Sequence, residues 1–219
     1  MNIGILGTGV VGQAIATALT EKGHNVRLGS RTTNSEKGAE WVKNSNEHAT
    51  QGDFADAASF GDIIFICLNG EHALDVVNSL IADDLQGKII VDVTNPLDFS
   101  KGMPPSILKE FTTTSMAEAI QQTLPAAHVV KALNTVNYKL MVNAKEVAGG
   151  DHNLFICGDN ADAKTKVKQL LVNDFNWNDE NILDLGGIEK ARVTEAIVPF
   201  WVSVMQALGS PLFNFKIVH

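Results

Sequence analysis

Residues 5–31 have the sequence ILGTGVVGQAIATALTEKGHNVRLGSR, in which a short apolar run leads into three closely spaced glycines. Gly7, Gly9 and Gly12 have the G-x-G-x-x-G spacing, directly after a predicted strand and at the start of a predicted helix. The first glycine permits a tight turn, the second lets the backbone approach a diphosphate, and the third allows close packing of helix and strand. In this context the motif predicts a dinucleotide-binding βαβ unit.

The second predicted strand of this unit ends in Ser30, Arg31, Thr32 and Thr33. In an NAD-binding unit, an acidic residue about 20 residues after the glycine turn holds the ribose, and that carboxylate would repel a 2′-phosphate. Arginine instead makes paired, charge-assisted hydrogen bonds to phosphate, and hydroxyl groups stand beside it here. These residues therefore predict NADP(H) as the cofactor.

The rest of the chain alternates short apolar runs with longer helical patterns. Runs that are apolar almost throughout are typical of strands in a parallel sheet that is covered on both faces. The sequence therefore predicts an α/β fold of the Rossmann type, with a doubly wound and mostly parallel sheet. The predicted strands are 2–6, 25–29, 62–68, 88–93, 128–133 and 153–157, and the predicted helices are 10–22, 35–45, 71–82, 115–124 and 161–172.

A polar connection at residues 143–153 suggests a division into two parts. We expect an NADP-binding domain over residues 1–145 and a small C-terminal α/β cap and dimerisation region over residues 146–219. Within the second part, residues 189–208 have helical spacing but are apolar over most of the circumference, and Pro199 should kink that helix.

The last residues, 212–218, alternate apolar and polar side chains, which predicts a short final strand. The apolar helix before them needs cover on more than one side, and we expect a homodimer that buries Trp201 or its neighbours. The alternative is that residues 100–124 fold over this helix within one chain.

The composition is that of an ordinary globular protein, with 219 residues, 45% hydrophobic and 19% charged. The net charge of −8 argues against nucleic acid as a partner. The 2 cysteines, Cys67 and Cys157, follow apolar runs, which predicts buried thiols. Without a signal-peptide pattern, or an apolar stretch near the ~20 residues that span a bilayer, we expect a cytoplasmic protein with no membrane partner.

Small, polar or rigid residues follow three of the later predicted strands, where ligands of open α/β sheets bind. They are Leu68, Asn69, Gly70, His72, Asn95, Pro96 and Asn134. We expect them to line the place of a nicotinamide and of a second flat ligand. The sequence shows no spacing typical of a metal site and no pattern of a nucleophilic triad, so we predict no metal and no catalytic side chain. Hydride transfer between two cofactors requires alignment rather than a protein base.

Several stretches recur in order in a known family. They are the glycine motif with its following strand, NGEHALDVV (69–77), VDVTNPL (91–97), VVKALNT (129–135), LFICGDN (154–160) and ARVTEAIVPFWVSVMQALG (191–209). Together they resemble the coenzyme F420-dependent NADP oxidoreductase family, whose fold is also used by the NADPH-oxidising domain of the STEAP metalloreductases. The resemblance implies a Rossmann domain with a small C-terminal cap, commonly dimeric. It also implies NADPH over the glycine turn and a deazaflavin or flavin stacked against the nicotinamide.

The resemblance also implies roles for residues at matching positions. It places Thr8, Val10 and Val11 in the diphosphate turn, Ser30 and Arg31 at the 2′-phosphate, and Asn69, Gly70 and His72 beside the cofactor. Thr32 stands where archaeal members usually have a second arginine, and Asn134 where they tend to have a histidine in the region facing the deazaflavin.

The leading hypothesis is an NADP(H)-dependent oxidoreductase that transfers hydride between NADPH and a small-molecule acceptor, either F420-like or a flavin. A second hypothesis is an NADPH-dependent reductase of a small imine or keto substrate, which needs a side chain that protonates the product; Lys131 and Tyr138 are the candidates. A third, from another class, is a non-catalytic NADP sensor that binds a partner protein.

Overall fold

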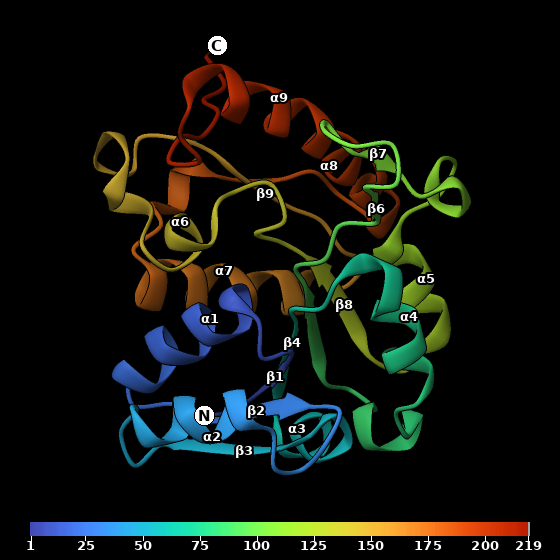
Figure 1. Ribbon diagram of the computed structural model, residues 1–219, viewed down its shortest axis with the longest axis vertical. Coiled ribbons are helices and arrows are strands. Elements are labelled where there is room, and N and C mark those ends of the chain that lie inside the picture. The colour runs from blue at the N-terminus through green and yellow to red at the C-terminus, as the bar shows by residue number, and fades with distance from the viewer. Residues whose placement is uncertain (219) are drawn as a thin grey trace.

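A six-stranded parallel sheet forms the centre of the computed structural model, which describes residues 1–218 (Figure 1). Its strand order is β3-β2-β1-β4-β5-β8, and every neighbouring pair is parallel. The six strands are β1 (Asn2–Leu6), β2 (Asn25–Ser30), β3 (Ala49–Asp53), β4 (Ile63–Ile66), β5 (Ile89–Asp92) and β8 (His128–Lys131). The chain runs outward from β1 to β3 and then returns to β4, so the order reverses between β1 and β4. This confirms the Rossmann-type fold and locates the crevice where such sheets bind ligands.

Helices cover both faces of the sheet. They are α1 (Val10–Glu21), α2 (Glu36–Lys43), α3 (Phe54–Phe60), α4 (Gly70–Asn78), α5 (Met116–Thr123), α6 (Tyr138–Val142), α7 (Ala161–Phe175), α8 (Ala191–Ala196) and α9 (Val198–Leu208). Single turns of 3₁₀ helix occur at Ala82–Leu85, Lys109–Phe111, Ala144–Glu146, Ala148–Gly150, Asp179–Asn181 and Ile188–Lys190.

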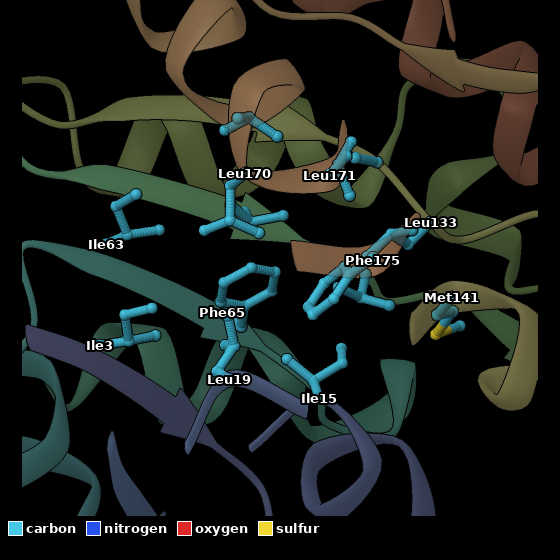
Figure 2. Packing of buried hydrophobic residues seen from close by; sticks show 14 of the residues in the cluster. Ile3, Ile15, Leu19, Ile63, Phe65, Leu133, Met141, Leu170, Leu171 and Phe175 are labelled. Carbon is cyan, nitrogen blue, oxygen red and sulfur yellow. The ribbon is translucent and has the colours of Figure 1, made fainter. Parts of the chain in front are cut away.

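The apolar strands serve two separate cores. Ile63 and Phe65 of β4 point into a core with α1, α6 and α7, and Figure 2 shows Phe65 between Leu19 of α1 and Leu170 of α7. Ile64 and Ile66 of the same strand point into a second core with α3, α4 and α5. Because successive side chains of a strand alternate between faces, a strand covered on both sides must be apolar throughout.

Two small sheets flank the central one. β6 (Leu97–Asp98) and β7 (Ser106–Ile107) form an antiparallel pair, and β9 (Leu154–Ile156) lies parallel to β10 (Ile182–Asp184). An antiparallel bridge between Lys131 and Cys157 joins the end of β8 to the end of β9. The core around α1 also contains residues of β9 and α7. The division between residues 145 and 146 stays a prediction.

The sequence analysis missed β3 and α3. β3 has the sequence ATQGD, which lacks the apolar run of the other strands because it lies at the sheet edge. Asp53 ends this strand and also begins α3, where its side chain and that of Asp56 form a reciprocal capping box.

The prediction of a final strand over residues 212–218 was wrong. The tail contains no strand, and its aromatic side chains pack on α9 instead. The Phe213 ring stacks on Trp201 with centroids 5.0 Å apart, and the Phe215 ring stacks on Phe200 at 5.8 Å. The alternation of apolar and polar residues therefore reflects one covered side of an extended tail, with no neighbouring strand to pair with.

The apolar segment 189–208 contains a break at Ile197, which separates α8 from α9. Pro199 lies in the first turn of α9, where its missing N–H has no helical partner to lose. None of the helices within residues 1–218 combines the length and the apolar character that crossing a membrane requires.

Candidate functional site

The glycine turn between β1 and α1 is built from contacts that leave no room for side chains. Gly7 has a φ of 127°, and its N–H donates to the Gly29 carbonyl at 3.0 Å. A Cβ on Gly7 would collide with the Cys67 carbonyl oxygen, and a Cβ on Gly12 would collide with the Gly7 carbonyl oxygen. These two glycines fix the turn at the carboxyl end of β1, as the motif predicts.

Gly9 has a different environment, which is open. A Cβ built on Gly9 meets no atom within 4 Å. Gly9 is the N-cap of α1, and this helix has neither a side-chain cap nor an acidic residue in its first turn. By contrast, side chains cap α2 to α7; the caps are Ser35, Asp53, Asn69, Ser115, Asn137 and Asn160. The N–H groups of α1 are thus left for an anion in the space above Gly9.

A cavity of about 380 Å³ lies beside this turn. Its lining residues are Gly7, Thr8, Gly9, Ser30, Arg31, Thr32, Ser35, Phe54, Cys67, Leu68, Asn69, His72 and Val76. Arg31 is exposed and has no ion-pair partner among residues 1–218. The Ser30 hydroxyl donates to the Thr32 carbonyl at 2.6 Å and so shapes the loop that carries the arginine.

A second cavity of about 610 Å³ shares Leu68 and Asn69 with the first. Its lining residues are Val10, Val11, Leu68, Asn69, Gly70, Val93, Asn95, Leu97, Phe99, Asn134, Thr135, Val136, Met141, Val198 and Trp201. We call the two the phosphate cavity and the ring cavity. Their volumes lie in the range typical of small-molecule sites.

Fourteen of the sixteen predicted cofactor-binding residues line one or both of these cavities. Gly12 and Pro96 line neither. Gly12 lies under the turn, and Pro96 lies behind Gly70, where a Cβ on Gly70 would meet the Pro96 Cα at 2.8 Å. Their role as ligand contacts stays a prediction.

Both cavities also contain residues outside the predicted set, and these come from segments spread along the chain. They are Ser35, Phe54, Cys67 and Val76 in the phosphate cavity, and Val93, Leu97, Phe99, Thr135, Val136, Met141, Val198 and Trp201 in the ring cavity. Cys67, Leu97 and Thr135 are direct neighbours of predicted residues, and Val93 and Val136 lie two residues from one, so strand ends could have indicated these five.

Two asparagines connect the walls of the ring cavity. The Asn95 side chain donates to the Asn134 carbonyl at 2.8 Å, and the Asn134 side chain donates to the Asn95 side-chain oxygen at 3.0 Å and to the Thr194 carbonyl at 3.0 Å. Asn134 Oδ1 and Trp201 Nε1 are buried without a hydrogen-bond partner within residues 1–218. A buried polar atom without a partner is costly.

The two candidate proton donors do not reach the ring cavity. Lys131 is completely buried and bound to Asp92, to Glu195 and to the Thr94 carbonyl. Burial alone would lower the pKa of Lys131, but the two carboxylates raise it above its ordinary value. Tyr138 packs against the core around α1. Neither is among the residues that line the cavity.

The cysteines have the character of unreactive thiols. Burial, followed by the charge of Asp92, raises the pKa of Cys67 far above its ordinary value, although part of its surface lines the phosphate cavity. Burial likewise raises the pKa of Cys157 to about 12. Both are free thiols, and residues 1–218 contain no cluster of side chains that could hold a metal ion.

Comparison with known proteins decides the family. The family model described as "NADP oxidoreductase coenzyme F420-dependent" matches residues 2–96. The chain is 31% identical over 214 residues to the F420-dependent NADP reductase of Methanocaldococcus jannaschii, with 93% of this chain and 92% of that protein covered. The chain belongs to the F420-dependent NADP oxidoreductase family. It is accordingly an NADP-dependent oxidoreductase.

Two further proteins are similar to this chain over nearly all of its length. The crystal structure of a putative F420-dependent NADP reductase from Arthrobacter sp. FB24 is 39% identical, with a TM-score of 0.91 and full coverage of both chains. The metalloreductase STEAP3 of Rattus norvegicus is 31% identical over 213 residues, which are 94% of this chain but 39% of that protein. Family members thus include chains of this length and domains of longer proteins.

The open space above Gly9 generates a first prediction. Gly9→Val should abolish binding of both NADPH and NADH, because the valine side chain fills the space that the diphosphate requires. The fold should persist, since the backbone of Gly9 is extended and no atom lies within 4 Å of the new Cβ. Titration calorimetry and circular dichroism measure the two effects.

The matched control is Ala161→Val, which places a valine in the exposed first turn of α7. It should bind both dinucleotides as the wild-type protein does. A folded Gly9→Val protein with normal NADPH affinity would show that the diphosphate lies elsewhere.

Proposed function

We propose that the chain binds NADP(H) across the two cavities and transfers hydride between its nicotinamide and a deazaflavin such as F420, or a flavin. The proposal rests on the residues at and after the end of β2. Arg31 forms no ion pair with another residue of the described chain. Ser30, Thr32 and Ser35 line the same cavity, and no carboxylate is among its lining residues. A cation with neighbouring hydroxyl groups suits a 2′-phosphate and gives NADP(H) preference over NAD(H).

The ring cavity supports a flat, largely apolar acceptor. Most of its lining is aliphatic or aromatic, and the polar members are amides and one hydroxyl. No titratable side chain occurs among these lining residues of the described chain. Hydride transfer between two rings suits this environment, because it depends on alignment and takes its accompanying proton from water.

The same observation disfavours the reduction of a small imine or ketone. That reaction needs a side chain near the product that supplies a proton. Lys131 is fully buried among its partners, and Tyr138 does not line the cavity. The names of the M. jannaschii and Arthrobacter relatives, which both refer to F420, also favour F420 as the acceptor.

Arg31→Ala tests the choice of cofactor. The variant should bind NADPH more weakly by about 1.5–3 kcal/mol, the contribution of a charge-assisted hydrogen bond. NADH, which has no 2′-phosphate, should bind with unchanged affinity. Titration calorimetry with both dinucleotides gives the answer, and Arg192→Ala, at another exposed arginine, is the control. An equal loss for both dinucleotides would mean that Arg31 has a structural role.

The acceptor is tested by the oxidation of NADPH, followed by absorbance, with F420, FMN, FAD and riboflavin in turn. We expect turnover with at least one of these rings and the fastest rate with F420. Phe99→Ala, which removes an aromatic wall of the ring cavity, should raise the KM for the acceptor and leave the Kd for NADPH unchanged. NADPH binding without turnover on any of the four rings would contradict the proposal and favour an NADP sensor.

We also propose that α9 and the tail form the interface of a homodimer. Only Val198 and Val202 of the 11 residues of α9 are buried, although most of this helix is apolar. Phe213 of the tail stacks on Trp201, and residues 100–124 contact α8, where Arg192 donates to the Thr113 carbonyl. Phe200 is 58% exposed and Leu208 60%, an apolar patch of the kind that marks an interface.

The dimer is tested by sedimentation at micromolar concentration. The wild-type protein should sediment as a dimer, and Phe200→Glu should sediment as a monomer, because the interface would bury an unpaired carboxylate at a cost of several kcal/mol. Gln206→Glu places the same charge at an exposed polar position of the same helix and serves as the control. A wild-type monomer, or a Phe200→Glu dimer, would contradict this interface.

A further inference from the structure

Three buried ionisable side chains form one cluster behind the ring cavity. Asp92 and Lys131 are fully buried, and Glu195 is 2% exposed. Lys131 Nζ lies 2.8 Å from Asp92 Oδ2, 2.7 Å from Glu195 Oε1 and 2.5 Å from the Thr94 carbonyl oxygen. Three acceptors match the three protons of an ammonium group, so Lys131 is charged.

Both carboxyl groups of the cluster are surrounded by donors. Asp92 Oδ1 accepts from the Thr94 N–H at 2.9 Å and the Thr94 hydroxyl at 2.7 Å, and Oδ2 accepts from Lys131. Glu195 accepts from Lys131 and, at the N-terminus of α5, from the N–H groups of Met116 at 3.0 Å and Ala117 at 3.4 Å. A protonated carboxyl would need an acceptor for its proton, so the geometry fits two carboxylates.

The cluster therefore holds one cation and two anions, which leaves one buried negative charge in excess. Lys131 and the Met116 N–H donate to different oxygens of Glu195, so its carboxylate ties α8 both to β8 and to the N-terminus of α5. The Thr94 donors and the N-terminus of α5 offset part of this charge, but burying an excess charge still opposes folding. Burial raises the pKa of the Glu195 carboxyl, in opposition to Lys131, which agrees with such a cost. The excess charge therefore also acts electrostatically on groups outside the cluster.

The position of the cluster indicates which group it acts on. Val93, directly between Asp92 and Thr94, lines the ring cavity, as does Asn95. Val198, three residues beyond Glu195, also lines this cavity. Asp92 is also close enough to raise the pKa of Cys67, at the floor of the neighbouring phosphate cavity. The negative charge therefore lies behind the wall of the cavity that the proposed function gives to the nicotinamide.

We propose that the Asp92–Lys131–Glu195 cluster makes the site bind NADP⁺ more tightly relative to NADPH, and so makes bound NADPH the stronger hydride donor. The inference rests on the proposed function. In that reaction C4 of the dihydronicotinamide loses a hydride, which carries both electrons to the acceptor ring. The nicotinamide becomes a cation, and a proton from water completes the reduced acceptor. A fixed negative charge stabilises the cation and has no counterpart to attract in NADPH.

Glu195→Gln tests this inference through the ratio of two dissociation constants. Removal of the excess charge should raise Kd(NADP⁺)/Kd(NADPH) about tenfold, the order of magnitude of an interaction between unit charges at an effective dielectric constant of about 20. A residue that acted only on the fold would change both constants by the same factor. The control is Glu189→Gln, which removes the same charge from an exposed side chain of the same region.

Fluorescence titration gives the constant for NADPH, and competition by NADP⁺ gives the other. Asp92→Asn removes the second carboxylate and is the alternative should Glu195→Gln fail to fold by circular dichroism. An unchanged ratio in a folded variant, or the same change in Glu189→Gln, would overturn the inference while the proposed function stands. Failure of the wild-type protein to bind either dinucleotide would overturn the proposed function, and the inference with it.

Discussion

Backbone contacts that exclude every side chain determine where the two cavities lie. Gly7 touches the end of β4 at Cys67, and Gly12 touches Gly7 itself, so β1, α1 and β4 meet without intervening side chains. Gly70 makes a similar contact with Asn95 and so presses the start of α4 against the end of β5. Any larger residue would separate these elements, and the carboxyl edge of the sheet would lose its crevice. The remaining features of the site follow from this packing.

The electrostatic design of the site is local and independent of the net charge of −8. Side chains satisfy the N-termini of the helices from α2 to α7, and α5 additionally receives the Glu195 carboxylate. α1 is left without such a partner at Gly9, next to the loop of Arg31. An acidic protein can thus bind an anionic dinucleotide, because helix-terminal N–H groups and one arginine act over short distances that solvent screens little.

Local patterns in the sequence were sufficient for five of the six strands of the parallel sheet and for most of the lining of the phosphate cavity. Gly7, Gly9 and Arg31 are close in sequence, and their spacing alone places them on one turn and the next strand end. Edge strand β3 was not predicted because its sequence, ATQGD, has no apolar run. A strand was wrongly predicted in the tail because Phe213 and Phe215 alternate with polar residues, although these two rings stack on α9. Each of these errors concerns a segment whose partners lie far away in the sequence.

The ring cavity and its charged cluster lie beyond sequence patterns for the same reason. Nothing in the sequence indicates that Asp92, Lys131 and Glu195 meet. Lys131 was a candidate proton donor, because no residue near it in the sequence shows that it is buried and paired with two distant carboxylates. Their meeting depends on how β5, β8 and α8 pack, and it changes the chemical role of the lysine from proton donor to part of a fixed charge. Trp201 likewise lines the cavity as part of α9, the helix that begins after the break at Ile197.

These features together match the charge distribution of one redox state of the cofactor. NADP⁺ carries negative charge at its phosphates and a positive charge on its nicotinamide ring, whereas NADPH keeps only the former. The chain offers Arg31 and the free N-terminus of α1 at one end of the joined cavities and a buried negative charge behind the other. In the proposed binding mode, the phosphate end would attract both forms equally and supply affinity alone. Discrimination between donor and product would then arise where their charges differ, at the ring, and there a fixed charge acts without reorganisation during the transfer.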